Sequence, residues 1–214
     1  MNLDILHKAV YPIGRITPQG AKLLGTCFAL NKPGLFATSL HVTDQNDTGL
    51  AMFVWDTEGI NSYQFPINEF RFANVKIIAA DPISDLCIIQ VPGDQRLDVK
   101  ITGSDQCKVL DSVNVVGYPH ATDGRNILTI QKAHIGAKIK MPVAGLPVKH
   151  LVLNMQTRPG QSGSPVFNDD STLIGVISGA YTSPASGIII DGLNPGAINQ
   201  TTYAVSSEYL LPML

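Results

Sequence analysis

The segment Pro159–Val166 reads PGQSGSPV and sets a serine among glycines. Gly160 lies two residues before Ser162, and Gly163 directly follows it. Such a loop turns sharply enough for the amides of Gly160 and Ser162 to converge on one point, as an oxyanion hole requires. Glycine at 160 also permits a backbone angle that residues with a β-carbon resist. We interpret Ser162 as a candidate nucleophile; the alternative is an ordinary Gly/Ser surface turn.

A serine nucleophile needs a base, and the base needs an acid to orient it. Among five histidines, His41 in ATSLHV stands at the junction of an apolar strand and a loop, where a side chain is held rigidly yet exposed. Asp85 in DPISDLCII opens an apolar strand; it is either a solvated turn acid or a carboxylate whose charge has a partner such as a histidine Nδ1–H. The remaining histidines are interpreted as ordinary surface or partly buried residues: His7, His120, His134 and His150.

Short apolar, β-branched runs separated by turn residues must position these groups, and they predict strand after strand. The first set is Val10–Ile16, Leu23–Leu30, Leu35–Thr38, Leu50–Trp55, Ser62–Ile67, Val75–Ala80 and Leu86–Val91. The second set is Ser112–Gly117, Ile127–Ile135, Val148–Met155, Pro165–Phe167, Leu173–Ser178 and Thr201–Val205. A helical pattern is expected only in the tail Ser206–Leu214, with Ser206 or Ser207 as a cap before Pro212.

The two sets are separated by the polar, turn-rich stretch Pro92–Lys108. Two groups of roughly six strands suggest two packed antiparallel barrels or sandwiches. We therefore predict an all-β protein with an N-terminal β unit over residues 1–95, a connector over 96–108, and a C-terminal β unit with a short closing helix over 109–214.

Composition excludes several functional classes. Lys and Arg number 15 and Asp and Glu 17, so the net charge is −2, which argues against binding to nucleic acid or to an anionic membrane. No run approaches the roughly 18 apolar residues of a membrane span. The three cysteines lack CxxC spacing, so no zinc site is expected, and no cofactor is expected either.

The N-terminus carries Asp4 and no long apolar core, so it does not resemble a secretory signal. Cys27, Cys87 and Cys107 are an odd number and are interpreted as three reduced, partly buried thiols. Together these features predict a cytoplasmic protein; the alternative is that the sequence begins after a removed N-terminal segment.

The order His41, Asp85, Ser162 and the sequences around them resemble the trypsin/chymotrypsin-like serine peptidases, most nearly the HtrA-type and glutamyl-endopeptidase-type branches. The resemblance spans about residues 10–209 and covers only the protease domain of the HtrA branch, without its PDZ module. The segments that carry it are LLGTCFALNKPGLFATSLHV, DPISDLCIIQV, SVNVVGYPHATDGRNILTIQKAHIG and PGQSGSPVFNDDSTLIGVISG.

The resemblance implies two six-stranded β-barrels with the active site in the cleft between them. It implies that Ser162 attacks the scissile bond, that His41 is the general base and that Asp85 orients it, with the amides of Gly160 and Ser162 as the oxyanion hole. The strand Ser178-Gly179-Ala180 would pair with the substrate backbone, and Ser178 would hydrogen-bond Asp85. In the extracellular members of the family a cysteine directly after the histidine pairs with one about fourteen residues upstream, where Cys27 stands here. Here Val42 follows His41, so that disulfide is absent.

The pocket that selects the residue before the scissile bond is expected to be shallow and uncharged. Gln156 stands where trypsin-like members carry an acid, and Ile177 stands where glutamyl endopeptidases carry a histidine. Ala180 and Thr201 stand where glycines leave a deep pocket. The expected activity is a serine endopeptidase that cuts peptides or proteins after a small or medium uncharged residue. The alternative is a catalytically idle peptide-binding module, or one that an unknown partner activates.

Overall fold

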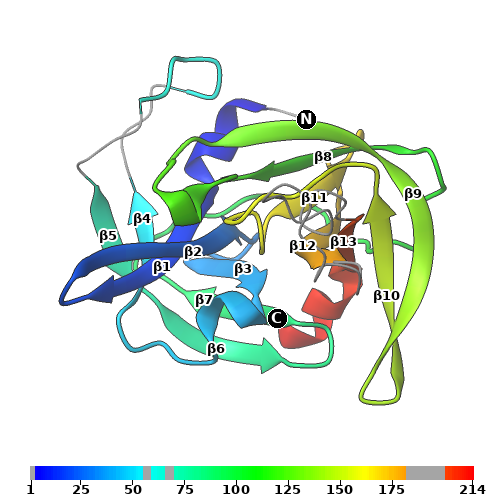
Figure 1. The fold of residues 1–214 in the computed structure, drawn as a ribbon, viewed down its shortest axis with the longest axis horizontal. Helices are drawn as coiled ribbons and strands as arrows, with labels where there is room; N and C mark the ends of the chain where they lie inside the picture. Colours follow the sequence, from blue (N-terminus) through cyan, green and yellow to red (C-terminus); the bar gives the residue numbers. More distant parts are fainter. Residues whose placement is uncertain (1–2, 55–58, 66–69, 182–200) are drawn as a thin grey trace, which may run out of the picture.

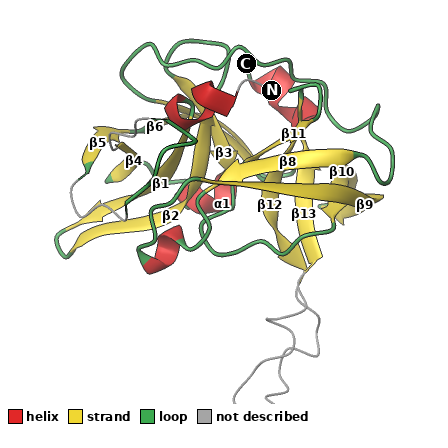
Figure 2. Ribbon diagram, turned by 90° about the horizontal axis from the view of Figure 1, so that it is seen from above, coloured by secondary structure: helices red, strands yellow, loops and turns green. Residues whose placement is uncertain are grey.

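The computed structural model describes residues 3–54, 59–65, 70–181 and 201–214, and most of this regular structure is antiparallel β-sheet. Figure 1 shows the first half of the chain, in blue to cyan, beside the second half, in green to red. The turned view in Figure 2 shows the same two groups of strands side by side, with α1 between them. The predicted all-β class is confirmed.

The first sheet has the strand order β5-β4-β1-β2-β3-β7-β6. Its end strands β5 and β6 are separated in the chain by Val75 alone, so the sheet curls round on itself. It is therefore a curled sheet of seven strands where a closed barrel of six was predicted. The elements of this half are η1 (Leu3–Lys8), β1 (Val10–Thr17), β2 (Gly20–Ala29), β3 (Leu35–Ser39), α1 (Leu40–Thr43), β4 (Leu50–Val54), β5 (Arg71–Asn74), β6 (Lys76–Asp81) and β7 (Leu86–Gln90).

The second sheet is a closed six-stranded barrel with the order β10-β13-β12-β11-β8-β9, as predicted. Closing the sheet removes the exposed edges on which unwanted strand pairing could begin. The elements of this half are β8 (Ser112–Gly117), η2 (Ala121–Asp123), β9 (Thr129–Val143), β10 (Leu146–Leu153), β11 (Pro165–Asn168), β12 (Leu173–Tyr181), β13 (Thr201–Ser206) and η4 (Ser207–Met213).

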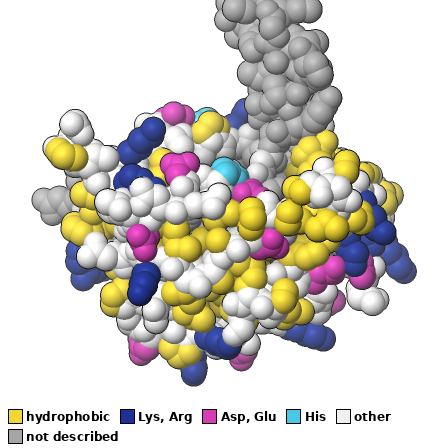
Figure 3. Space-filling view, turned by 90° about the horizontal axis from the view of Figure 1, so that it is seen from below, with side chains coloured by type: hydrophobic (Ala, Val, Ile, Leu, Met, Phe, Trp, Pro, Cys, Tyr) yellow, Lys and Arg dark blue, Asp and Glu magenta, His cyan; other side chains and the backbone are white. Residues whose placement is uncertain are grey.

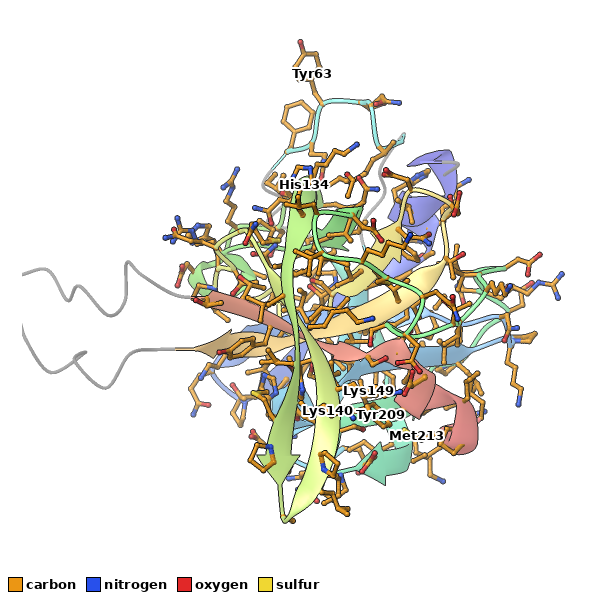
Figure 4. The ribbon with its side chains drawn as sticks, turned by 90° about the vertical axis from the view of Figure 1, so that its right-hand side faces the viewer. Tyr63, His134, Lys140, Lys149, Tyr209 and Met213 are labelled. Atoms are coloured by element: carbon orange, nitrogen blue, oxygen red, sulfur yellow. The ribbon has the colours of Figure 1, made fainter. Side chains whose placement is uncertain are left out.

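The predicted strand Ser62–Ile67 is wrong over its described part, residues 62–65; residues 66–67 lie outside the described residues. The alternating pattern comes from a loop in which the Gln64 side chain bonds the backbone of Leu128, accepting from its N–H at 2.8 Å and donating to its carbonyl at 2.9 Å. Tyr63 is 98% exposed and points away from the body of the protein in Figure 4. The strand that pairs with β4 is instead β5, which the sequence patterning missed.

The stretch predicted as a connector is bound to both halves. Leu97 N–H donates to the Leu30 carbonyl at 2.9 Å, and Thr102 N–H donates to the Leu173 carbonyl at 3.1 Å. The closing helix η4 is a 3-10 helix that contains Pro212. Ser206 precedes it but does not cap it, because its hydroxyl accepts the N–H of Ser104 at 2.9 Å.

Lys149 joins η4 to the barrel, since its ammonium bonds carboxylate oxygens of Asp105 and Glu208 at 2.8 Å each. The backbone N–H of Lys149 also donates to the Tyr209 hydroxyl, and Figure 4 shows Lys149 and Tyr209 close together. The hydrogen bonds of its ammonium raise the pKa of Lys149, and the one to Asp105 lowers the pKa of that carboxyl, so Lys149 and Asp105 are both charged at neutral pH.

Two apolar clusters stabilise the fold. One fills the barrel and includes Val115, Leu151 and Ile177. The larger one crosses between the halves, because it contains Phe36 of β3 together with Val205 of β13. Hydrophobic burial across this boundary fixes one half against the other, as a site built from both halves requires.

We predict that Cys27, Cys87 and Cys107 are three unpaired thiols that react slowly in the native protein. All three are buried, and burial raises the pKa of each thiol, that of Cys87 to about 11, so the reactive thiolate is scarce at neutral pH. A thiol titration should find three groups after denaturation, and reductant should change neither the mass nor the thermal midpoint. One reactive thiol after denaturation, with the mass of a disulfide, would contradict the prediction.

Candidate functional site

His41 lies in α1, a single helical turn directly after β3. Its Nδ1 is 2.6 Å from Oδ2 of Asp85, and its backbone N–H donates to Oδ1 of the same carboxylate at 2.9 Å. An ionised carboxylate only accepts hydrogen bonds, so it holds the proton on Nδ1 and leaves Nε2 as the basic nitrogen. The His41 side chain is 47% exposed and therefore open to a substrate.

Asp85 reaches His41 because β3 and β7 are paired, with Ser39 opposite Leu86. Its backbone φ of +56° lies in the left-handed region that aspartate tolerates better than most residues. The Asp85 carbonyl accepts the N–H of Leu40 at 2.9 Å, so main chain and side chain both bind α1. The predicted pairing of Asp85 with a histidine is thus observed, and the solvated-turn alternative is not.

The loop that carries Ser162 depends on two glycines with positive φ, +97° at Gly160 and +85° at Gly163. A β-carbon at Gly163 would lie 2.1 Å from the carbonyl oxygen of Thr26, so only glycine fits there. Gly163 N–H donates to the Ile177 carbonyl at 2.8 Å, and Ile177 N–H donates to the Ser164 carbonyl at 2.9 Å. The loop is therefore held against β12.

Thr26 of β2 holds the same loop from the other half of the protein. Its N–H donates to the Ser162 carbonyl at 2.8 Å, and its hydroxyl donates to the Gly160 carbonyl at 2.8 Å. That hydroxyl also accepts the N–H of Tyr118 at 3.2 Å, and the Thr26 carbonyl accepts the hydroxyl of Thr38 at 2.7 Å. Sequence reasoning did not single out Thr26, because threonine inside an apolar strand is ordinary sheet composition.

Gly25 brings the serine loop beside the histidine. A β-carbon there would lie 2.8 Å from the Ser162 carbonyl oxygen and 2.8 Å from each γ-carbon of Val42. The backbone of Ser162 and the neighbour of His41 thus pack on the same small residue. The structure therefore gathers His41, Asp85 and the Ser162 loop at one place between the two sheets.

The backbone of the serine loop leaves two donors available. The Pro159 carbonyl accepts the N–H of His120 at 2.7 Å, and because this peptide is trans, the N–H of Gly160 points the opposite way. Among the residues that the structure describes, neither Gly160 N–H nor Ser162 N–H donates a hydrogen bond to the protein. Two unpaired amides in one turn can bind an anionic oxygen.

The predicted substrate-binding residues lie near the ends of β12 and β13. Ser178 and Gly179 are half-buried at a β-bulge, and Gln156 is exposed. The Ser178 hydroxyl donates to the Tyr203 carbonyl at 3.4 Å, so its predicted bond to Asp85 is wrong. The side chain of Ala180 lies outside the described residues, although its backbone belongs to β12.

Two neighbouring threonines on β13 differ in burial and in their hydrogen bonds. Thr201 is half-buried opposite Tyr181, whereas Thr202 is fully buried. The Thr202 hydroxyl donates to the Met155 carbonyl at 2.7 Å and accepts the N–H of Thr157 at 3.0 Å. It therefore positions the short segment that contains Gln156, a role that sequence reasoning did not identify.

Two buried titratable groups have pKa values that the Asp85 charge influences. Burial lowers the pKa of His150, so it is neutral at neutral pH. Burial and the nearby Asp85 carboxylate raise the pKa of Cys87. In the described part of the chain, no group of three or more His, Cys, Asp or Glu residues is placed to hold a metal ion. Figure 3 shows acidic and basic side chains interspersed with apolar ones over the face that it displays.

The chain is similar to known proteins in sequence and in fold. Residues 25–176 match the trypsin-like peptidase domain family. The chain is 26% identical over 174 residues to a probable periplasmic serine endoprotease, DegP-like, of Marinomonas sp. (strain MWYL1), which covers 80% of this chain and 33% of that protein. The chain thus spans about a third of the length of the curated relatives it matches.

Solved structures share the fold. The MamO protease domain from Magnetospirillum magneticum, in its apo form, superposes with a TM-score of 0.71 at 15% identity, over 98% of this chain and 97% of that one. The HtrA-type protease AlgW with a tripeptide superposes with a TM-score of 0.67 at 18% identity, over 97% and 59% of the two chains. The chymotrypsin-like fold implied by the sequence resemblance is confirmed.

The predicted cytoplasmic location is wrong, because the curated relatives are named periplasmic enzymes. Unpaired cysteines show that a protein lacks disulfides, but they do not identify its compartment. In the described residues no helix has the length and apolar character needed to cross a membrane. The family match over residues 25–176 and the two-sheet fold agree with the resemblance seen in the sequence, and the chain belongs to the trypsin-like peptidase family.

Proposed function

We propose that this chain is a serine endopeptidase that uses Ser162, His41 and Asp85. The observation that carries the proposal is the 2.6 Å contact between His41 Nδ1 and Asp85 Oδ2, beside a serine loop held in place from both halves. Asp85 sets the imidazole tautomer and stabilises the imidazolium that forms during the reaction. The substrate is a peptide or protein, and no cofactor takes part.

The proposed reaction uses each of these groups in turn. His41 Nε2 takes the proton of the Ser162 hydroxyl as Oγ attacks the scissile carbonyl, and it then gives that proton to the leaving amine. The N–H groups of Gly160 and Ser162 bind the oxyanion of the tetrahedral intermediate. Water hydrolyses the acyl-enzyme by the same proton transfers. The edge of β12 from Ser178 to Ala180 receives the substrate backbone as an added strand.

A catalytically idle or partner-activated peptide-binding module is the second candidate. The same cleft and strand edge would serve it, but peptide binding does not require the carboxylate-histidine contact. Two unpaired amides in the serine loop also favour the first candidate, because they are available without a rearrangement.

Ser162→Ala should reduce peptide cleavage by about 10⁴-fold or more, because it removes the nucleophile while leaving the loop backbone in place. The measurement is turnover of a peptide library, with circular dichroism to check the fold. Equal cleavage by the variant and the wild type would rule out the serine mechanism.

The residue before the scissile bond should be small or medium and uncharged. A Lys or Arg entering near Gln156 would lose water without gaining a carboxylate, and a Glu would find no cationic partner at Ile177. Val, Ala, Leu or Thr should therefore exceed Arg and Glu in kcat/KM by roughly 30–150-fold, or about 2–3 kcal/mol. A positional-scanning library that peaks at Arg, Lys or Glu would disprove this pocket.

Thr26→Val should lower kcat by about tenfold or more, because it keeps the side-chain volume but removes the hydroxyl that binds the Gly160 carbonyl and the Tyr118 N–H. Thr17→Val is the matched control, since the Thr17 hydroxyl bonds the Gly20 carbonyl at 2.9 Å in the exposed β1–β2 hairpin. Kinetics should separate the two variants. Equal loss in both would show that Thr26 does not position the serine loop.

A further inference from the structure

A groove of about 330 Å³ lies between β2, β4 and the η2 turn. Its apolar wall is formed by Leu23, Phe53 and Phe70, and the two phenylalanine rings meet edge to face with centroids 5.0 Å apart. Phe53 is buried, whereas Phe70 is 41% exposed. Polar residues stand at the other side of the groove: Lys22, Asp123 and Asn126. The groove thus has an apolar wall facing a polar one, and a concave surface that combines apolar side chains with a few polar groups is typical of a ligand subsite.

The groove begins next to the serine loop. Leu23 is two residues before Gly25, which packs on the Ser162 carbonyl. A regular strand advances about 3.3 Å per residue, and β2 is bulged between Leu23 and Gly25, so the two residues stand within about 7 Å of each other, the reach of two residues of extended peptide. On the opposite wall, Ala121 contacts the loop, since a β-carbon on Gly160 would lie 2.9 Å from the Ala121 β-carbon.

The groove and the β12 edge lie on different sides of Ser162. Gly163 bonds Ile177 of β12, whereas Gly160 packs against Ala121 of the groove. Residues before the scissile bond pair with β12 in the proposed function, so the residues after the bond leave in the direction of the groove.

The groove also contains an unused hydrogen-bond acceptor. Oδ1 of Asn126 is buried, and it has no hydrogen-bond partner among the residues that the structure describes. A buried polar atom without a partner is costly, so such groups are usually satisfied by protein, water or ligand. Because Oδ1 is closed to solvent, the Asn126 side chain must turn before this atom can accept a peptide N–H in the groove.

From these observations we infer that the groove binds the second or third residue after the scissile bond and prefers an aromatic or large apolar side chain there. The inference rests on the proposed function, because the cleaved peptide is the occupant. Phe70 stacks on the entering side chain, and Asn126 accepts a backbone N–H. Lys22 and Asp123 carry opposite charges at the rim, so a charged side chain of either sign gains no net attraction.

The test compares peptides that differ only at these two downstream positions, carrying Phe, Gly or Asp. The wild type should cleave the Phe peptide at least about 10-fold faster in kcat/KM than the Gly or Asp peptide. Phe70→Ala should reduce that preference to within about threefold, and Thr122→Trp, which fills the groove from its exposed rim, should do the same. Phe72→Ala is the matched control, because Phe72 is 53% exposed and does not line the groove.

Two further measurements distinguish a failure of the groove proposal from a failure of the proposed function. A substrate with a chromogenic leaving group and no downstream residues should be cleaved equally by the wild type, by the two groove variants Phe70→Ala and Thr122→Trp, and by the control Phe72→Ala. Binding of fluorescent Phe and Gly peptides to Ser162→Ala, measured by anisotropy, needs no turnover and should show the same preference. If the chromogenic substrate is not cleaved, the proposed function fails and the binding result still decides the groove. Equal binding of the two peptides, or equal effects of Phe70→Ala and Phe72→Ala, would overturn the inference.

Discussion

The site depends on the contact that Thr26 makes across the two halves of the protein. Every polar group of this fully buried residue forms a hydrogen bond. Toward the second half, its N–H donates to Ser162, and its hydroxyl donates to Gly160 and accepts from Tyr118. Buried polar groups are costly unless every one is paired, so the halves must meet in one register. That register places the serine loop of the barrel beside the histidine turn of the curled sheet.

Each half contributes one rigid piece to this arrangement. In the first half, the pairing of β3 with β7 places His41 and Asp85 together, and Asp85 binds α1 through both its carboxylate and its carbonyl. In the second half, Gly163 occupies a left-handed position where a β-carbon would collide with Thr26. The two pieces are held together by an apolar cluster that contains residues of both halves, so neither half can position the whole site alone.

The sequence predicted the candidate site residues His41, Asp85 and Ser162 and the class of fold, because these depend on local patterns. A glycine-flanked serine, a histidine after an apolar strand and an acid before another strand are visible without a structure. Strand pairing is less visible: residues 62–65 alternate like a strand but form a loop tethered by Gln64, and β5 carries too few apolar residues to stand out. Thr26 and Thr202 escaped notice because their roles depend on partners distant in the chain. The compartment was mispredicted because cysteine pairing reports on disulfides and not on location.

The proposed function depends on activation of the Ser162 hydroxyl by His41 in the folded chain. Labelling with a fluorophosphonate, followed by intact mass and peptide mapping, tests it most directly, because this reagent reacts with activated serines and needs no knowledge of the substrate. We expect one adduct per chain, located on Ser162 and abolished in denaturant. No adduct on the folded chain, or an adduct on another serine, would contradict it.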